Sequence, residues 1–176
     1  MAGVSAVVLA LGANLGEREA TLASAVSELD AVQGLAVRAT SALFATAPVG
    51  GPDQPDYLNA VVLAETTLSP AQLLAATQAI EAAHGRVRLQ RWAARTLDID
   101  LITYGENDSV DEVIQEHPDL TLPHPRAHER AFVLAPWASV DPSARLRMPG
   151  GRLADVRQLL ETASDRDGVR RVGGPC

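Results

Sequence analysis

Two carboxylates and four guanidinium groups lie close together in the middle of this chain. The segment RVRLQRWAARTLDIDLI holds Asp98 and Asp100, separated by one isoleucine, directly after the arginines Arg86, Arg88, Arg91 and Arg95. On a strand, the two carboxylates would point to one face, with Cα atoms roughly 6–7 Å apart. A hard divalent cation such as Mg²⁺ would relieve their repulsion. The pair therefore indicates a metal site, although solvated or arginine-paired aspartates would give the same pattern.

The neighbouring arginines strengthen the metal interpretation. Guanidinium groups bind phosphate oxygens in pairs and stay charged. A nucleoside triphosphate with Mg²⁺ requires such groups around its phosphates. We therefore favour a triphosphate site over the plainer alternative, a solvated loop held by salt bridges.

A second set of residues combines aromatic rings with an amide. Tyr57 and Asn59 share a strand face by the same alternation, Trp92 lies among the arginines, and Phe132 follows His-Glu-Arg. A flat heterocycle stacked on the rings, with its edge hydrogen-bonded by the amide, would account for this set. Taken singly, Tyr57 and Phe132 fit a hydrophobic core equally well.

The histidines do not indicate a zinc site. His124 and His128 are four residues apart, but Pro125 lies between them and no third ligand is near in the sequence. We expect His124 to be neutral and to donate to a phosphate instead. Gly12 and Gly16 are more simply explained by a tight strand-to-helix turn than by a phosphate-binding loop.

Composition excludes several classes of protein. The 176 residues carry a net charge of -7 and contain no lysine, which excludes a Walker A phosphate loop and a Schiff-base enzyme. An acidic chain is not expected to bind nucleic acid over a broad surface. No apolar run approaches the roughly 18 residues of a membrane span. The lone Cys176 excludes an internal disulfide and fits a cytoplasmic location.

The predicted elements that carry these residues alternate as β-α-β-β-α-β. Ser69 as N-cap and Pro70 as first helical residue mark the second helix clearly. This order predicts an α+β fold with a ferredoxin-like core, an antiparallel sheet with helices packed on it, plus C-terminal additions. The predicted segments are 4–12, 16–34, 35–44, 57–67, 70–84 and 95–105.

The remainder of the chain shows weaker patterns. Residues 105–121 hold six acidic side chains and predict an exposed loop, and 123–142 predict an irregular segment with one short helix. A closing helix is expected within 150–163. We interpret 1–163 as a single domain and 164–176 as a flexible tail.

Four stretches together resemble the 6-hydroxymethyl-7,8-dihydropterin pyrophosphokinase family: LGANLGERE, DQPDYLNAVV, RWAARTLDIDLITYG and LPHPRAHERAFVLAP. They occur in the family's order, and RWxxRTLDIDL is the most specific of them. The resemblance implies transfer of pyrophosphate from ATP to the pterin hydroxymethyl group, with release of AMP, in folate biosynthesis. The chain would then be an ATP-dependent diphosphotransferase.

The resemblance also implies roles for individual residues. Two Mg²⁺ ions would be bound by Asp98 and Asp100. The catalytic residues would be Arg86, Arg91, Arg95 and Asp98. ATP would be bound by Gln78, Glu81, Arg88, Arg91, Arg95, His124 and Arg130. The pterin would be bound by Thr46, Val49, Tyr57, Asn59, Trp92 and Phe132.

The sequence departs from the family in places. Leu89 stands where many members carry a basic residue, and Pro125 stands where some carry tyrosine. Neither departure removes a metal ligand. The alternative is a non-catalytic ferredoxin-like module that binds a nucleotide, which would leave the aspartate pair and Trp92 unexplained. We expect a monomer that binds ATP and the pterin, and neither nucleic acid nor a membrane.

Overall fold

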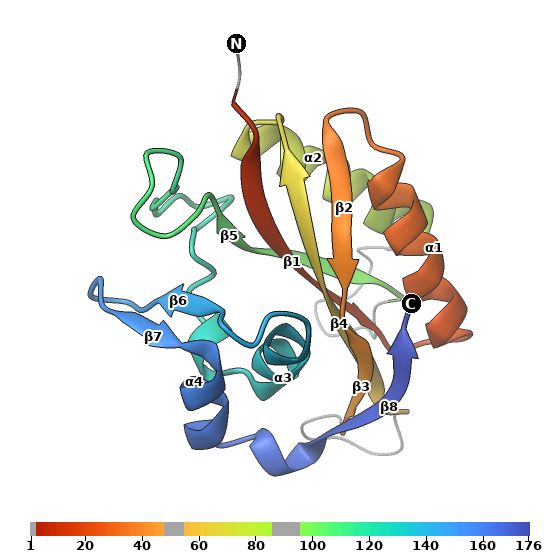
Figure 1. The fold of residues 1–176 in the computed structure, drawn as a ribbon. Helices are drawn as coiled ribbons and strands as arrows, with labels where there is room; N and C mark the ends of the chain where they lie inside the picture. Colours follow the sequence, from red (N-terminus) through yellow and green to blue (C-terminus); the bar gives the residue numbers. More distant parts are fainter. Residues whose placement is uncertain (1–2, 48–54, 86–95) are drawn as a thin grey trace.

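The computed structural model describes residues 3–47, 55–85 and 96–176 (Figure 1). Its centre is a six-stranded sheet in the order β5-β1-β4-β3-β8, with β2 also paired to β4. All of these strand pairs are antiparallel. The strands are β1 (Ser5–Ala13), β2 (Leu35–Thr40), β3 (Ala42–Thr46), β4 (Tyr57–Thr66), β5 (Asp98–Tyr104) and β8 (Val169–Pro175).

Two helices cover one face of the sheet. They are α1 (Arg18–Asp30) and α2 (Pro70–Ala83), and their buried leucines pack with β1 and β4 in the larger hydrophobic cluster. In α2, the Ser69 hydroxyl accepts from the Gln72 amide, and the Gln72 side chain accepts from the Ser69 amide. This capping box begins the helix where the sequence predicted it. The ferredoxin-like element order is confirmed.

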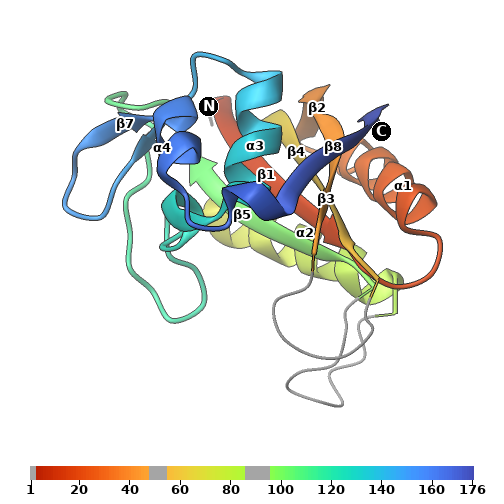
Figure 2. The same cartoon turned by 90° about the horizontal axis from the view of Figure 1, so that it is seen from below.

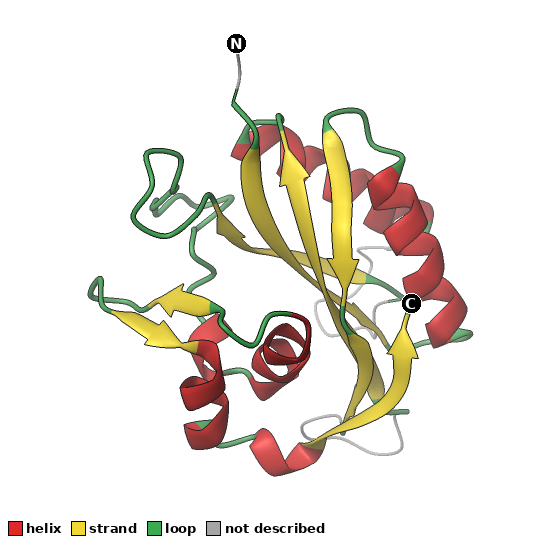
Figure 3. Cartoon of the chain, in the orientation of Figure 1, coloured by secondary structure: helices red, strands yellow, loops and turns green. Residues whose placement is uncertain are grey.

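The other face of the sheet is covered by later elements (Figures 2 and 3). Helix α3 (Ala131–Val140) buries Val133, Leu134 and Trp137 against this face, and α4 (Val156–Thr162) packs beside it. A small hairpin of β6 (Arg145–Arg147) and β7 (Leu153–Asp155) precedes α4. Short 3-10 turns, η1 (Ala127–Glu129) and η2 (Arg166–Gly168), complete the fold.

The strand expected over 35–44 is in fact two strands. Ser41 separates β2 from β3 and is buried. Its hydroxyl accepts from the Val61 amide and donates to the Ala42 carbonyl, both at 2.8 Å. The side chain therefore takes the place of a backbone ladder contact, and the chain continues along β4 in a new register. Sequence alternation alone does not reveal such a break.

The C-terminal segment also differs from the expectation of a tail. Residues 169–175 form β8, which pairs with β3 at the edge of the sheet. Just before it, both carboxylate oxygens of Asp165 accept from the Ala131 amide at 3.0 and 3.1 Å, which caps the first turn of α3. The segment 164–176 is therefore tied to the sheet and to α3.

The acidic segment 105–121 is a loop, as expected, but it is anchored. Arg147 on β6 donates to Glu112 at 2.7 Å and to Asp108 at 2.7 Å, which draws the loop onto the small hairpin. Gly105 has φ +84°, and a Cβ there would lie 2.1 Å from the Asp111 carbonyl oxygen. Only glycine fits this turn. Among the described residues, no helix is long and apolar enough to cross a bilayer.

Candidate active site

Strand β5 carries the two aspartates. Ile99 and Leu101 are buried in the cluster beneath α1 and α2, whereas Asp98 and Asp100 are half-buried. Because side chains alternate along a strand, the carboxylates lie on the opposite face, the one that α3 partly covers. The expected placement of both carboxylates on one face is therefore confirmed.

A row of side chains crosses the sheet at Asp98. Asp98 on β5 is in register with Gly12 on β1, Gly12 with Asn59 on β4, and Asn59 with Phe44 on β3. We call Asp98, Gly12, Asn59 and Phe44 the cross-strand row. Since adjacent strands lie about 4.8 Å apart, the Asp98 and Asn59 backbones are roughly 10 Å apart. Between the carboxylate and the amide, this row therefore carries no side chain, only the backbone of Gly12.

Position 12 has little room for a side chain. A Cβ at this position would lie 3.2 Å from the Asn59 Oδ1 atom, closer than side chains normally approach. The Asn59 amide is itself fixed, because its Nδ2 donates to Thr46 Oγ1 at 2.8 Å. Asn59 is buried, and Thr46 is in register with Tyr57. Thr46, Tyr57 and Asn59 thus lie together, as the sequence predicted.

Phe44 is a candidate that the sequence analysis missed. It is buried in the cross-strand row next to Asn59 but belongs to neither hydrophobic cluster of the described residues. Its neighbours Leu43 and Ala45 belong to the cluster beneath α1 and α2. The alternation around Phe44 was the available signal, and the break at Ser41 obscured it.

His124 lies along the outer edge of β5, on the side away from β1. Its backbone amide donates to the Ile102 carbonyl at 2.8 Å, and its Nδ1 accepts from the Arg126 amide at 3.2 Å. Burial lowers the pKa of His124, the Asp100 charge opposes that shift, and the positive charges of Arg130 and Arg126 add to it. In a neutral imidazole only one nitrogen carries a proton. Because Nδ1 accepts a hydrogen bond, the proton is on Nε2, and Nε2 can donate to a ligand.

Arg130 ends on the same side of the sheet. Burial lowers its pKa and the nearby Asp100 charge opposes this, but a guanidinium remains charged at neutral pH. The guanidinium carbon lies 5.5 Å from the centre of the Phe132 ring, a cation–π arrangement that orders both side chains. Phe132 is half-buried at the edge of the α3 cluster. Asp100, His124, Arg130 and Phe132 are thus brought together.

Gln78 and Glu81 are placed differently. Both belong to α2, on the sheet face opposite the carboxylates, and Glu81 is buried whereas Gln78 is exposed. The two residues were expected to share one face of the helix, but one side chain is exposed to solvent and the other is buried. Helix α2 packs on β5, the edge strand, so a ligand that wraps this edge could reach both faces. The candidates Val49, Arg86, Arg88, Arg91, Trp92 and Arg95 lie outside the described residues.

The donor set of the described residues suits Mg²⁺ held partly by a ligand. In the described parts of the chain, no three His, Cys, Asp or Glu side chains gather as a metal cluster. Two carboxylates on an open strand face match the way proteins bind Mg²⁺, through one or two carboxylates together with waters and substrate phosphates. The pair Asp98 and Asp100 fits such an ion.

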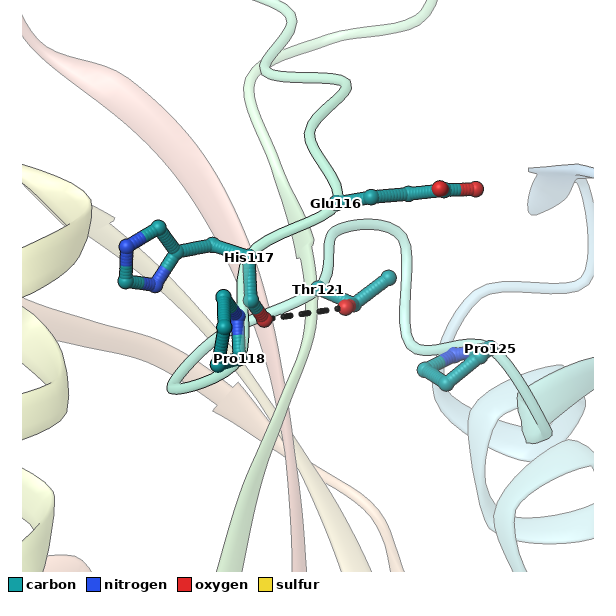
Figure 4. Close-up of a pocket in the computed structure, with 5 residues that line it drawn as sticks. All are labelled: Glu116, His117, Pro118, Thr121 and Pro125. Atoms are coloured by element: carbon teal, nitrogen blue, oxygen red, sulfur yellow. Dashed lines mark hydrogen bonds between the residues drawn. The ribbon is translucent and has the colours of Figure 1, made fainter.

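An open pocket lies next to His124 in the chain. It is lined by Glu116, His117, Pro118, Thr121 and Pro125 (Figure 4). Within it, the Thr121 hydroxyl donates to the His117 carbonyl at 3.4 Å, and Pro125 faces them from the other side. The pocket therefore borders the β5 edge at which His124 is held.

Comparison with known proteins assigns the chain to a family. Residues 8–142 match the family model described as 7,8-dihydro-6-hydroxymethylpterin-pyrophosphokinase (HPPK). The chain belongs to the HPPK family. It resembles the enzymes named 2-amino-4-hydroxy-6-hydroxymethyldihydropteridine pyrophosphokinase from Mycobacterium tuberculosis, at 44% identity over 93% of this chain and 88% of the relative, and Pseudomonas aeruginosa, at 37% over 97% and 99%. The aspartate pair and both ends of the cross-strand row lie within the HPPK match.

Solved structures agree on the fold. The Plasmodium falciparum HPPK-DHPS wild type with pteroate superposes with a TM-score of 0.68 at 13% identity, covering 96% of this chain. The chain spans about half of that solved chain, 46% of it. A second crystal structure of the same protein, with pterin and p-hydroxybenzoate, gives a TM-score of 0.64. At this level of identity the likeness supports the HPPK fold.

Proposed function

We propose that this chain transfers pyrophosphate from ATP to the hydroxymethyl group of 6-hydroxymethyl-7,8-dihydropterin in folate biosynthesis, and that it does so on the α3 face of the sheet. The family match and the relatives' names support the reaction. The cross-strand row supports this placement, since the Asp98 carboxylate and the Asn59 amide lie on one face with Gly12 between them. A metal-bound phosphate and a heterocycle could meet there.

The pterin would lie over β4 and β3. Because Asn59 Nδ2 is engaged by Thr46, Oδ1 is directed toward Gly12 and can accept from an N–H group on the heterocycle's edge. Tyr57 and Phe132 would offer ring faces for stacking. Val49 and Trp92 complete the proposed set by the family resemblance. Because the Asn59 acceptor is fixed in place, the site would favour a heterocycle that carries an N–H donor on its edge over one that lacks this donor.

ATP would lie along β5 and the His124 segment. Asp98 and Asp100 would hold Mg²⁺, two ions by the family resemblance, and the bound metal would neutralise phosphate charge and orient the phosphates. His124 would donate from Nε2 to a phosphate oxygen, and Arg130 would pair with another. The roles of Arg88, Arg91, Arg95, Gln78 and Glu81 in binding ATP remain part of this proposal.

The chain's own contribution to the reaction is then positioning and electrostatic. The pterin hydroxyl oxygen attacks the β-phosphorus in line, the bond from that phosphorus to the bridging α-phosphate oxygen breaks, AMP leaves with that oxygen, and the hydroxyl proton is released to solvent. The arginines and His124 stabilise the charge that builds on the phosphate oxygens. Arg86, Arg91, Arg95 and Asp98 are the proposed catalytic residues.

Product analysis tests the function directly. The protein is incubated with ATP, Mg²⁺ and the reduced pterin, and the nucleotides are separated. We expect AMP to form only when the pterin and Mg²⁺ are both present, and chelation of the metal to stop it. ADP as the main product would refute pyrophosphate transfer. A nucleotide-binding module without catalysis would give neither product.

Two further properties stay predictions. The lone cysteine fits a reducing, cytoplasmic location, and the chain is expected to act as a monomer. Sedimentation at the concentrations used for the assay would measure the second.

A further inference from the structure

Two arginines from distant parts of the chain converge on Asp56. Arg18, the first residue of α1, donates from its guanidinium to the Asp56 backbone carbonyl. Arg170 on β8 pairs with the Asp56 carboxylate at 3.1 Å. Asp56 directly precedes Tyr57, the first residue of β4. We call Arg18, Asp56 and Arg170 the Asp56 clamp.

The clamp acts on the peptide group that leads into Tyr57. The carbonyl that accepts from Arg18 belongs to the peptide bond between Asp56 and Tyr57. Leu58 and Ala60 of β4 are buried beneath α1 and α2, and α1 itself carries Arg18, so the clamp lies on that side of the sheet. The Tyr57 side chain lies on the other side, with Asn59. The clamp therefore holds the backbone of Tyr57 without occupying the face proposed for the pterin.

Strand β8 is adjacent to the same residues. Val169 on β8 is in register with Thr46, and Thr46 is in register with Tyr57. Arg170 is in register with Ala45, which is buried beneath α1 and α2, so its side chain projects to the side of the clamp. The whole strand lies beyond residue 142, where the family match ends. The family match therefore does not account for β8.

We propose that Arg18 and Arg170 are positioning residues for the pterin, and that β8 is thereby part of the active site. Together they fix the orientation of the Asp56–Tyr57 peptide group, and so the ring of Tyr57. The inference rests on the proposed function for its kinetic consequence. Neither arginine would touch either substrate.

The expected effect is small and selective. The Arg170–Asp56 ion pair is exposed, and the Arg18 contact is a hydrogen bond to a backbone carbonyl, so each is expected to contribute little. Loss of either contact corresponds to a change of about threefold in an equilibrium constant. We therefore expect Arg170→Ala or Arg18→Ala to raise the KM for the pterin about threefold, and the double variant about tenfold. The KM for ATP and kcat should stay within about twofold of wild type, because loss of uniform binding of one substrate raises only its KM.

The sheet offers a matched control. Arg38 on β2 pairs with Glu65 on β4 at 2.7 Å, and the two side chains are 61% and 42% exposed, against 62% and 37% for Arg170 and Asp56. Arg38→Ala thus removes an equally exposed ion pair on β4, away from Tyr57. Arg170→Lys should recover most of the wild-type pterin KM, since a point charge can still meet the Asp56 carboxylate.

The experiment combines kinetics with hydrogen exchange of the amides at residues 57–59. The inference predicts a raised pterin KM and faster exchange in the double variant, with neither change in Arg38→Ala. An unchanged pterin KM, an equal rise in the KM for ATP, or unchanged exchange would overturn it. If wild type forms no pterin-dependent AMP, the proposed function fails, whereas the exchange comparison still decides whether the clamp holds Tyr57.

Discussion

Replacing Asp100 by asparagine should separate activity from stability. Asp100→Asn keeps the size of the side chain and removes its charge. Asp100 is half-buried on β5, opposite Ala10, and its charge acts on His124 and Arg130. No apolar packing is lost. The structure therefore predicts a large catalytic effect with a small cost in stability.

The magnitude of the stability change follows from Arg130. Because the pKa of His124 is lowered, its ring is neutral at pH 7, and among the described residues the charge interaction that the substitution removes is the one between Asp100 and Arg130. Screened ion pairs of this kind contribute about 0.2–1 kcal/mol. For a chain of this size, 1 kcal/mol shifts Tm by about 2–4 °C. We expect Tm to fall by no more than about 4 °C.

The catalytic effect should be far larger. A bound metal ion stabilises the charge of a transition state by several kcal/mol. Since each 1.36 kcal/mol changes the rate tenfold, loss of a metal ligand should lower kcat about 1000-fold. The assay measures AMP formation at saturating Mg²⁺, beside a thermal melt. Asp119→Asn is the control, since the Asp119 side chain is 84% exposed. A kcat within tenfold of wild type would refute the metal assignment, and a drop in Tm above about 10 °C would show a structural role instead.

Two other predictions concern the acidic loop and the pterin pocket. Hydrogen bonds from Arg147 hold the pKa of Glu112 below its ordinary 4.5, so this contribution to stability is present above pH 4.5 and is lost as pH falls through the lowered pKa. Glu112→Gln should therefore lower Tm at pH 7, and its difference from wild type should shrink as pH falls below 4.5; a difference that stays constant as pH falls would contradict this cause. Thr46→Val removes the acceptor of Asn59 Nδ2 and should raise the pterin KM up to about tenfold, since the freed amide is a buried polar group. Thr46→Ser should restore the KM, and failure of this rescue would show that the hydrogen bond does not position Asn59.

The clearest sequence signals were local ones. Alternation in DIDLITY placed the carboxylates opposite Ile99 and Leu101, and the Ser69 cap began α2 at Pro70. Both patterns depend on neighbouring residues alone, so one sequence is sufficient to read them. The β-α-β-β-α-β order followed from such signals.

The C-terminal strand could not be predicted in the same way. VRRVGGP has no alternation of apolar and polar residues, and its glycines and proline disfavour a strand. Its pairing with β3 and the contact of Arg170 with Asp56 are long-range, so tertiary structure overrides local preference here. The position of α2 relative to the carboxylates could not be predicted for the same reason. The spacing of residues along a helix indicates which side chains share a helix face, but not which side of the sheet the helix covers.

Two residues of the cross-strand row illustrate what register adds. Gly12 was interpreted only as part of a turn, and Phe44 was not singled out, because their importance arises from pairing with Asn59. The pairing between strands cannot be recognised from one sequence, because it depends on the register of the strands in the folded sheet. When the register is known, the cross-strand row links the carboxylate side of the candidate site to its amide side.

A crystal structure with a non-hydrolysable ATP analogue, the reduced pterin and Mn²⁺ in place of Mg²⁺ tests the central claim most directly. The anomalous signal of Mn²⁺ locates the metal independently of the ligands. The account predicts metal bound by the carboxylates of Asp98 and Asp100, phosphates reaching His124 and Arg130, and the pterin edge on Asn59 beside Tyr57. Metal held away from both aspartates, or a pterin seated elsewhere, for instance in the pocket at His117, would contradict it.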